Sequence, residues 1–138
     1  MALVPAPYLR QGLLSNATTD LGLAMFMLLG SGLLTHALAL SASLLVSAGV
    51  MLGAFSILLG TLSLRPAVSA AAIWAVIGAN LLWAAESLLV IATGWVQPTR
   101  AGAVLLLAQA GVAAMYAGLQ FVGLGEQSAT RLASNSAV

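Results

Sequence analysis

Residues 21–64 read LGLAMFMLLGSGLLTHALALSASLLVSAGVMLGAFSILLGTLSL and contain no Asp, Glu, Lys or Arg. As a single helix this stretch would be about 66 Å long, whereas the hydrocarbon core of a bilayer is ~30 Å thick. It therefore has the length of two membrane crossings. Glycines and the polar pair Thr35-His36 interrupt its middle, so we expect a turn between Gly30 and Ser41, with His36 in that turn.

Two further apolar stretches follow, and each is preceded by a sequence that breaks helices. Arg65-Pro66 separates the second stretch from the third, because proline is common at a helix boundary. Gln97-Pro98-Thr99-Arg100 separates the third stretch from the fourth in the same way. The predicted spans are 13–33, 40–63, 70–95 and 101–123, between an N-terminal cytoplasmic segment at 1–12 and a polar, disordered tail at 124–138.

The composition supports a membrane protein with almost no soluble part. The chain has 138 residues, of which 62% are hydrophobic and 5% are charged, and its mean hydropathy is +1.10. A soluble domain usually carries about 25% charged residues. The apolar stretches are continuous rather than alternating, so they predict helices and not the strands of a barrel. We predict an all-α membrane protein, a bundle of four transmembrane helices in one domain.

Charge and residue types exclude several classes of function. The net charge is +1, from four Arg and three acids, so there is no basic patch for nucleic acid. The chain has no Cys and one His, His36, which excludes disulfides, cysteine-ligated metals and a pair of haem ligands within one chain. No nucleophile–base pair or phosphate-binding loop is recognisable. We therefore expect no enzymatic activity, no cofactor and no metal.

The arginines predict the orientation in the membrane. Four helices place both termini on one side, together with Arg10, Arg65 and Arg131, whereas Arg100 falls on the other side. Because cytoplasmic loops carry the excess of positive charge, we predict cytoplasmic termini. The expected location is the bacterial inner (plasma) membrane, as a multi-pass protein.

A cleaved first segment is the alternative for the N-terminus. Arg10, an apolar run and then Ala37-Leu38-Ala39 resemble a signal peptide with its cleavage site. Cleavage there would leave three helices. Asp20 at the head of the run, and the length of the segment, favour an uncleaved first helix.

Two ionisable residues, Asp20 and Glu86, lie inside the predicted spans. A charge at mid-bilayer costs about 2.5–3.5 kcal/mol on insertion scales, so each needs a partner or a function. From the helical rise, Asn80 lies at a depth similar to that of Asp20, and Gln109 at a depth similar to that of Glu86. We predict that Asp20 lies near Asn80 and that Glu86 lies near Gln109.

These polar residues have a structural and a functional interpretation. In the first, they join helices, with Glu86 protonated because burial disfavours the charged form. In the second, Asp20 and Glu86 form a proton or cation relay. We favour the structural role, because the two acids lie in opposite halves of the membrane. Similarly, Asn80, Trp83 and Ser87 share one helix face, which could line a ligand cavity or belong to the core.

Small residues recur on two of the predicted helices. In lipid they allow close approach of helix backbones, which is what stabilises helix pairs there. The main expectation is packing within one chain, and the alternative is a face for a second protomer or a partner subunit. The candidate packing residues are Gly49, Gly53 and Gly60 on the second helix and Ala110, Ala114 and Gly118 on the fourth.

The second half of the chain carries a set of aromatic, polar and small residues at fixed spacing. They are Trp74-Ala75-Val76-Ile77, Asn80, Trp83, Ser87, Gly94-Trp95-Val96, Pro98-Thr99, Gln109-Ala110, Leu119-Gln120-Phe121 and Gly123-Leu124. In these residues, the stretch 71–125 resembles a family of small, uncharacterised four-helix proteins of the bacterial inner membrane. The N-terminal half resembles that family only in hydropathy and helix count. The resemblance implies a four-helix fold in the inner membrane and implies no activity.

Two functional hypotheses follow from the sequence. The first is a non-enzymatic structural protein or an accessory subunit, in contact with the lipid bilayer and with another membrane subunit or a second copy. The second is a small oligomeric transporter of ions or small molecules that uses Glu86 and Asp20. A polar cavity that reaches Glu86 would favour the second hypothesis, whereas a dry core with both acids hydrogen-bonded would favour the first.

Overall fold

The computed structural model describes the backbone of residues 2–3, 5 and 7–136, and the side chains of residues 5 and 7–126. The described residues form four helices and one short strand pair. Each helix is long and apolar enough to cross a membrane, and in the last helix this holds for Arg100–Glu126. The predicted all-helical class and the number of helices are therefore confirmed. The elements are β1 (Ala2–Leu3), α1 (Pro7–Leu38), α2 (Ala42–Leu64), β2 (Val68–Ser69), α3 (Ala70–Ala92) and α4 (Arg100–Ser136).

The first turn is shorter than the sequence predicted. Gly30 remains helical, and α1 continues to Leu38, where Ala39 leaves the helix with a φ of 52°. Ser41 then caps α2, because its side chain accepts a hydrogen bond from the backbone N–H of Leu44. His36 consequently lies exposed in the last turn of α1 rather than in the connecting turn.

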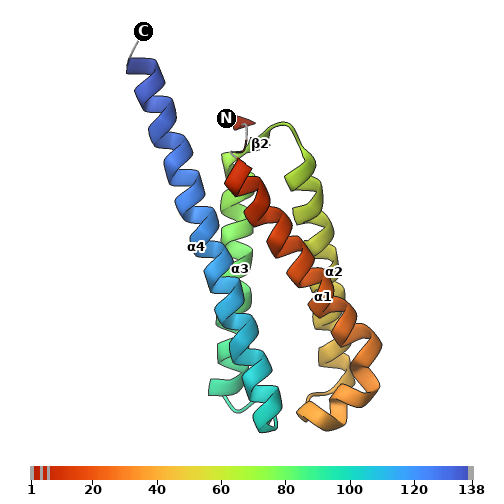
Figure 1. Cartoon of the computed structure of the whole chain (residues 1–138). Helices are drawn as coiled ribbons and strands as arrows, with labels where there is room; N and C mark the ends of the chain where they lie inside the picture. The colour runs from red at the N-terminus through yellow and green to blue at the C-terminus, as the bar shows by residue number, and fades with distance from the viewer. Residues whose placement is uncertain (1, 4, 6, 137–138) are drawn as a thin grey trace.

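The last helix is longer than predicted. Helix α4 continues to Ser136, so the prediction of a disordered tail at 124–138 is wrong for the residues that the structure describes. Residues 126–136 contain neither Gly nor Pro and include several good helix formers. In Figure 1 this part of α4 extends beyond the ends of the other three helices.

The helices form a bundle that is open on one side. Helix α1 packs along α2 and along α4, and α4 packs along α3, whereas α2 and α3 contact each other little. Both termini lie at one end of the bundle, and the α1–α2 and α3–α4 connections lie at the other (Figure 1). The order around the bundle is therefore α2, α1, α4, α3, with the open side between α2 and α3.

Buried positions alternate at spacings of three and four residues along every helix. This spacing is typical of helices that cross at a shallow angle in left-handed bundles. Each helix carries at least one polar residue on this buried seam. The seam positions are Leu9, Leu13, Asn16, Asp20 and Ala24 in α1; Leu45, Gly49, Leu52, Ser56 and Leu59 in α2; Ile73, Ile77, Asn80, Ala84 and Ser87 in α3; and Leu106, Ala110, Ala113, Ala117, Gln120 and Leu124 in α4.

Two apolar clusters close the ends of the bundle. At the end that holds the termini, Leu9, Leu13, Leu59 and Ile73 belong to one cluster and are at most 2% exposed. At the opposite end, a second cluster includes Leu34, Leu38, Leu40, Leu45 and Leu106. Asp20 and Ser56 lie between residues of the two clusters, whereas Asn16 and Gln120 lie among residues of the first.

The two connecting turns are tied to each other at the end opposite the termini. The backbone N–H of Thr99 donates to the carbonyl oxygen of Leu38 over 3.0 Å. The hydroxyl of Thr99 donates to the carbonyl oxygen of Ala37 over 2.8 Å. Gly102 lies so close to the Leu38 carbonyl that a Cβ at this position would overlap with it. These contacts hold the α1–α2 pair against the α3–α4 pair.

Candidate ligand-binding cavity

A cavity of 630 Å³ lies where α2 and α3 diverge, and side chains from all four helices line it. Most of the lining is apolar and comes from residues such as Leu23, Leu52, Phe55, Trp83 and Leu105. A second cavity of 140 Å³ adjoins it and shares some of its lining residues, among them Met51, Trp83, Glu86 and Gln109. The hollow therefore extends along much of the open side of the bundle.

The structure brings all four of the predicted polar residues to this one cavity. Asp20 comes from α1, Asn80 and Glu86 from α3, and Gln109 from α4. The sequence had suggested two separate polar pairs at two depths. Instead, the four residues line a single space together with Thr19.

Asp20 is the most deeply buried acid in the described part of the chain. It lies on the buried seam of α1 and is 9% exposed. Its Oδ2 atom has no hydrogen-bond partner among the described residues. Asp20 lines the cavity, and its Oδ2 atom is enclosed by the protein without an ion-pair or hydrogen-bond partner among the described residues.

The expected contact between Asp20 and Asn80 is not a hydrogen bond. The side-chain Nδ2 of Asn80 donates instead to Oε1 of Gln120, over 3.2 Å, in the interior of the bundle. Helix α3 packs along α4 and not along α1. The side-chain amide of Asn80 therefore bonds to a residue of α4. Asp20 and Asn80 nevertheless line the same cavity.

Glu86 and Gln109, which the sequence predicted to lie near each other, line the same cavity, but the amide of Gln109 bonds to another residue. Nε2 of Gln109 donates to the hydroxyl of Ser87 over 3.3 Å, and that hydroxyl donates to the carbonyl oxygen of Trp83 over 2.8 Å. Ser87 lies on the buried seam of α3, whereas Glu86 is exposed. Neighbouring residues of a helix point about 100° apart, so Glu86 lies at the edge of the cavity, on its open side.

Sequence reasoning missed several buried polar residues close to the cavity. Asn16 is 0% exposed, and neither of its side-chain polar atoms has a partner among the described residues. Gln120 is 1% exposed and leaves its Nε2 atom unpartnered. The signal that could have found both residues is their place on the seam, since each follows leucines or alanines at spacings of three and four.

Hydroxyl groups connect the same region to neighbouring helices. The Ser56 hydroxyl donates to the carbonyl oxygen of Ala17 over 2.7 Å and so joins α2 to α1. The hydroxyls of Thr19 and Tyr116 share a hydrogen bond of 2.9 Å between α1 and α4. These two bonds satisfy their own polar groups and leave Asp20 without a partner.

The small residues of α2 pack mainly within the chain. A Cβ at Gly49 would lie 2.8 Å from Cγ of Leu28 and 3.2 Å from the carbonyl oxygen of Ala24. A Cβ at Gly53 would meet only the Cβ of Ala24, at 3.8 Å, and a Cβ at Gly60 would meet nothing within 4 Å. Of these three glycines, Gly49 therefore lies closest to α1.

The small residues predicted on α4 divide between two faces. Ala110 is buried in a cluster with Ala84 and Ala113. Ala114 and Gly118 are exposed, and a Cβ at Gly118 would meet nothing within 4 Å. The stripe therefore does not form one packing surface, because steps of four residues turn gradually around the helix.

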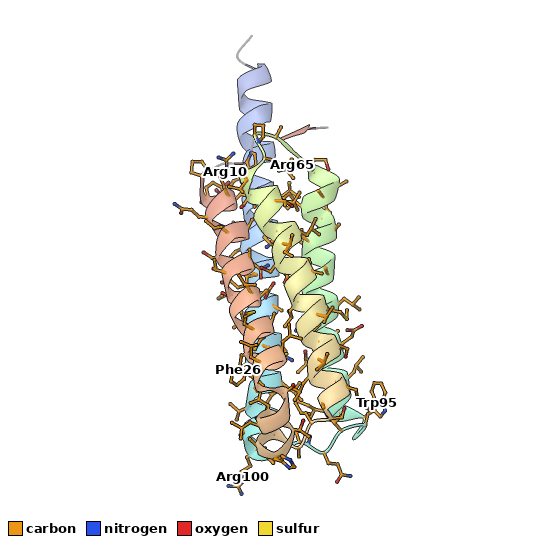
Figure 2. The ribbon with its side chains drawn as sticks, turned by 90° about the vertical axis from the view of Figure 1, so that its right-hand side faces the viewer. Arg10, Phe26, Arg65, Trp95 and Arg100 are labelled. Carbon is orange, nitrogen blue, oxygen red and sulfur yellow. The ribbon has the colours of Figure 1, made fainter. Side chains whose placement is uncertain are left out.

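No basic residue lies among the described residues that line the cavity. Arg10 donates to the carbonyl oxygen of Arg65 over 3.1 Å at the end that holds the termini. Arg100 lies at the opposite end of the bundle, as does Trp95 (Figure 2). Within the described residues, no group of three His, Cys, Asp or Glu could hold a metal ion. The two acids of the cavity are therefore not neutralised by a cation of the described chain.

Comparison with protein-family models, curated proteins and solved structures gives no match. The resemblance of residues 71–125 to the small inner-membrane family therefore stays a prediction. What the arrangement can do follows from its geometry. It can hold a molecule that is largely apolar and that presents hydrogen-bond donors or positive charge to Asp20.

Proposed function

We propose that this protein is a multi-pass protein of the bacterial inner membrane that binds and carries a small molecule in the cavity between α2 and α3. The observation that carries the proposal is that Asp20, which is buried, and Glu86, which is exposed, both line this cavity. Arg10 and Arg65 lie at the end that holds the termini, and Arg100 lies at the other. This distribution supports cytoplasmic termini.

The alternative role of the acids, as a means of joining helices, fits the geometry less well. An acid that joins two helices should be hydrogen-bonded to its neighbour, because an unpartnered buried polar group is costly. Asp20 has an oxygen without a partner. The cavity also has a volume of 630 Å³, within the range of roughly 300–1,000 Å³ that is typical of small-molecule sites.

The position of the cavity supports access from the side of the bundle. Apolar clusters close both ends of the bundle. Helices α2 and α3 contact each other little, and Glu86 lies exposed where they diverge. A ligand dissolved in the lipid could enter there without crossing the closed ends.

Native mass spectrometry of the protein, extracted from its own membrane in mild detergent, tests the proposal. The expected result is a chain that carries a small molecule of defined mass. Ala79 lines the cavity, so Ala79→Phe should displace that molecule. Ala75 lies one turn away on α3, is exposed and is not part of the lining, so Ala75→Phe is the matched control and should retain it. Equal retention by both variants would contradict the proposal.

An accessory subunit is the second candidate, and the outer face of α4 favours it. Ala114 and Gly118 are exposed there, and small residues on an outer helix face allow close packing of another helix in lipid. The same mass spectra test this candidate. A stoichiometric assembly with another chain, or a homo-oligomer, would support this candidate if Gly118→Leu disrupts it. The control is Gly78→Leu, at an exposed glycine of α3, which should leave the assembly intact. A monomer would speak against it.

A further inference from the structure

We propose that the ligand of the cavity is a lipophilic organic cation, with its charged group at Asp20 and its apolar part against the side chains of α2 and α3. This inference rests on the proposed function, since it names the class of molecule that the cavity binds. It follows from the charge of the lining, from the burial of Asp20 and from the apolar character of the remaining surface.

The charge of the lining selects a cation. Two carboxyl groups and no basic residue belong to the described lining. A carboxylate in apolar surroundings is stable only with a compensating charge or a proton. Oδ2 of Asp20 is buried and lacks a partner within the described chain. Because Asp20 lines the cavity, a bound ligand with positive charge would supply the compensating charge that its carboxyl group lacks, whereas both acids would repel an anion.

The apolar surface selects an organic cation over an inorganic one. An inorganic cation needs several oxygen ligands around it or has to keep its water shell. Most of the lining here is apolar, from residues such as Leu52, Phe55, Leu58 and Val112. Trp83 also belongs to the lining, and indole rings attract organic cations. An organic ion can bury its carbon skeleton against these side chains and keep its charge near the carboxyl group.

The two acids differ in depth, which predicts unequal roles. Asp20 is 9% exposed and faces the interior of the cavity, whereas Glu86 is exposed at its open side. An interaction between charges is stronger in a buried, less polar environment than in an exposed one. Asp20 should therefore hold the bound cation, and Glu86 should mainly favour its approach between α2 and α3.

Isothermal titration calorimetry with two probes of similar shape and opposite charge tests the inference. The probes are tetraphenylphosphonium and tetraphenylborate, added to the purified full-length protein in an uncharged detergent. Tetraphenylphosphonium should bind and tetraphenylborate should not. Asp20→Asn should weaken binding of the cation about tenfold or more, in line with the loss of a charge-assisted contact, and Glu86→Gln should weaken it less.

The third acid of the chain provides the matched control. Glu126 lies outside the cavity lining, so Glu126→Gln removes the same charge and should leave the affinity unchanged. Circular dichroism and gel filtration establish that each variant is folded. Ala79→Phe keeps both acids and should abolish binding by filling the cavity, which tests the site even if Asp20→Asn does not fold.

The remaining outcomes separate this inference from the proposed function. Equal binding of the two probes, or unchanged cation affinity in folded Asp20→Asn, would overturn the cationic ligand class. If the cationic ligand class is overturned in this way but Ala79→Phe releases the natural small molecule in native mass spectra, the proposal of a small-molecule carrier stands. If Ala79→Phe affects neither probe nor natural ligand, both proposals fail.

Discussion

Asn80 on α3 donates a hydrogen bond to Gln120 on α4 over 3.2 Å, in the buried interior of the bundle. Both residues are at most 3% exposed, and the bond joins α3, which borders the open side of the bundle, to α4. Asn80 also lines the cavity. The pair therefore fixes one wall of the candidate site.

Breaking this pair should destabilise the bundle more than removing it altogether. Asn80→Leu leaves the amide of Gln120 buried without a partner, which costs about 1–3 kcal/mol. The double variant Asn80→Leu with Gln120→Leu removes both polar groups and should recover part of that loss. Unfolding in sodium dodecyl sulphate, followed by circular dichroism, measures both. Additive effects of the two substitutions would show that the hydrogen bond contributes nothing.

Enlarging Gly49 should separate α1 from α2. A side chain there would meet Leu28 and the backbone of α1, and overpacking of this kind typically costs about 1–3 kcal/mol. Gly49→Val should therefore lower the detergent concentration at which half of the protein unfolds. Gly60→Val is the control, because a Cβ at that position meets nothing within 4 Å. An equal loss of stability in both variants would point to helix propensity rather than to packing.

Removing the hydroxyl of Thr99 should loosen the end of the bundle opposite the termini. This hydroxyl donates to Ala37 and accepts from the backbone N–H of Gly102, so it joins the two turns and caps α4. Loss of a cap costs about 0.5–2 kcal/mol, and Thr99→Val should show a loss of that size. Thr93→Val removes a hydroxyl that bonds only within its own helix turn, to Leu89, and should cost less. Hydrogen exchange of the amides around Leu38 and Gly102 reports where the change occurs.

The orientation can be measured directly because the chain has no cysteine. Ala67 and Gln97 are exposed residues in the connections at opposite ends of the bundle. With cytoplasmic termini, a membrane-impermeant maleimide should label Gln97→Cys in intact spheroplasts. It should label Ala67→Cys only after the membrane is permeabilised. The reverse pattern would place the termini outside the cytoplasm.

Local patterns in the sequence predicted the helices better than their partners. The apolar stretches and the prolines at 66 and 98 indicated four helices, and Asp20, Asn80, Glu86 and Gln109 all reached one cavity. The hydrogen bonds of Asn80 to Gln120 and of Gln109 to Ser87 could not be predicted, because the depth of a residue along its helix does not say which neighbouring helix it packs against. The end of α1 was misplaced for a related reason: the glycines near Gly30 are compatible with a helix when tertiary packing holds Leu34 and Leu38 in place.

The sequence by itself determined that the protein forms long apolar helices and that two acids lie within them, since hydropathy and helical rise depend only on the order of residues. The tertiary structure decided that α2 and α3 diverge, that Asp20 is left without a partner for one of its oxygens, and that Glu86 lies at the open edge. These features arise from the rotation of each helix about its axis and from which helices touch. Both are set by packing between residues that are far apart in the chain.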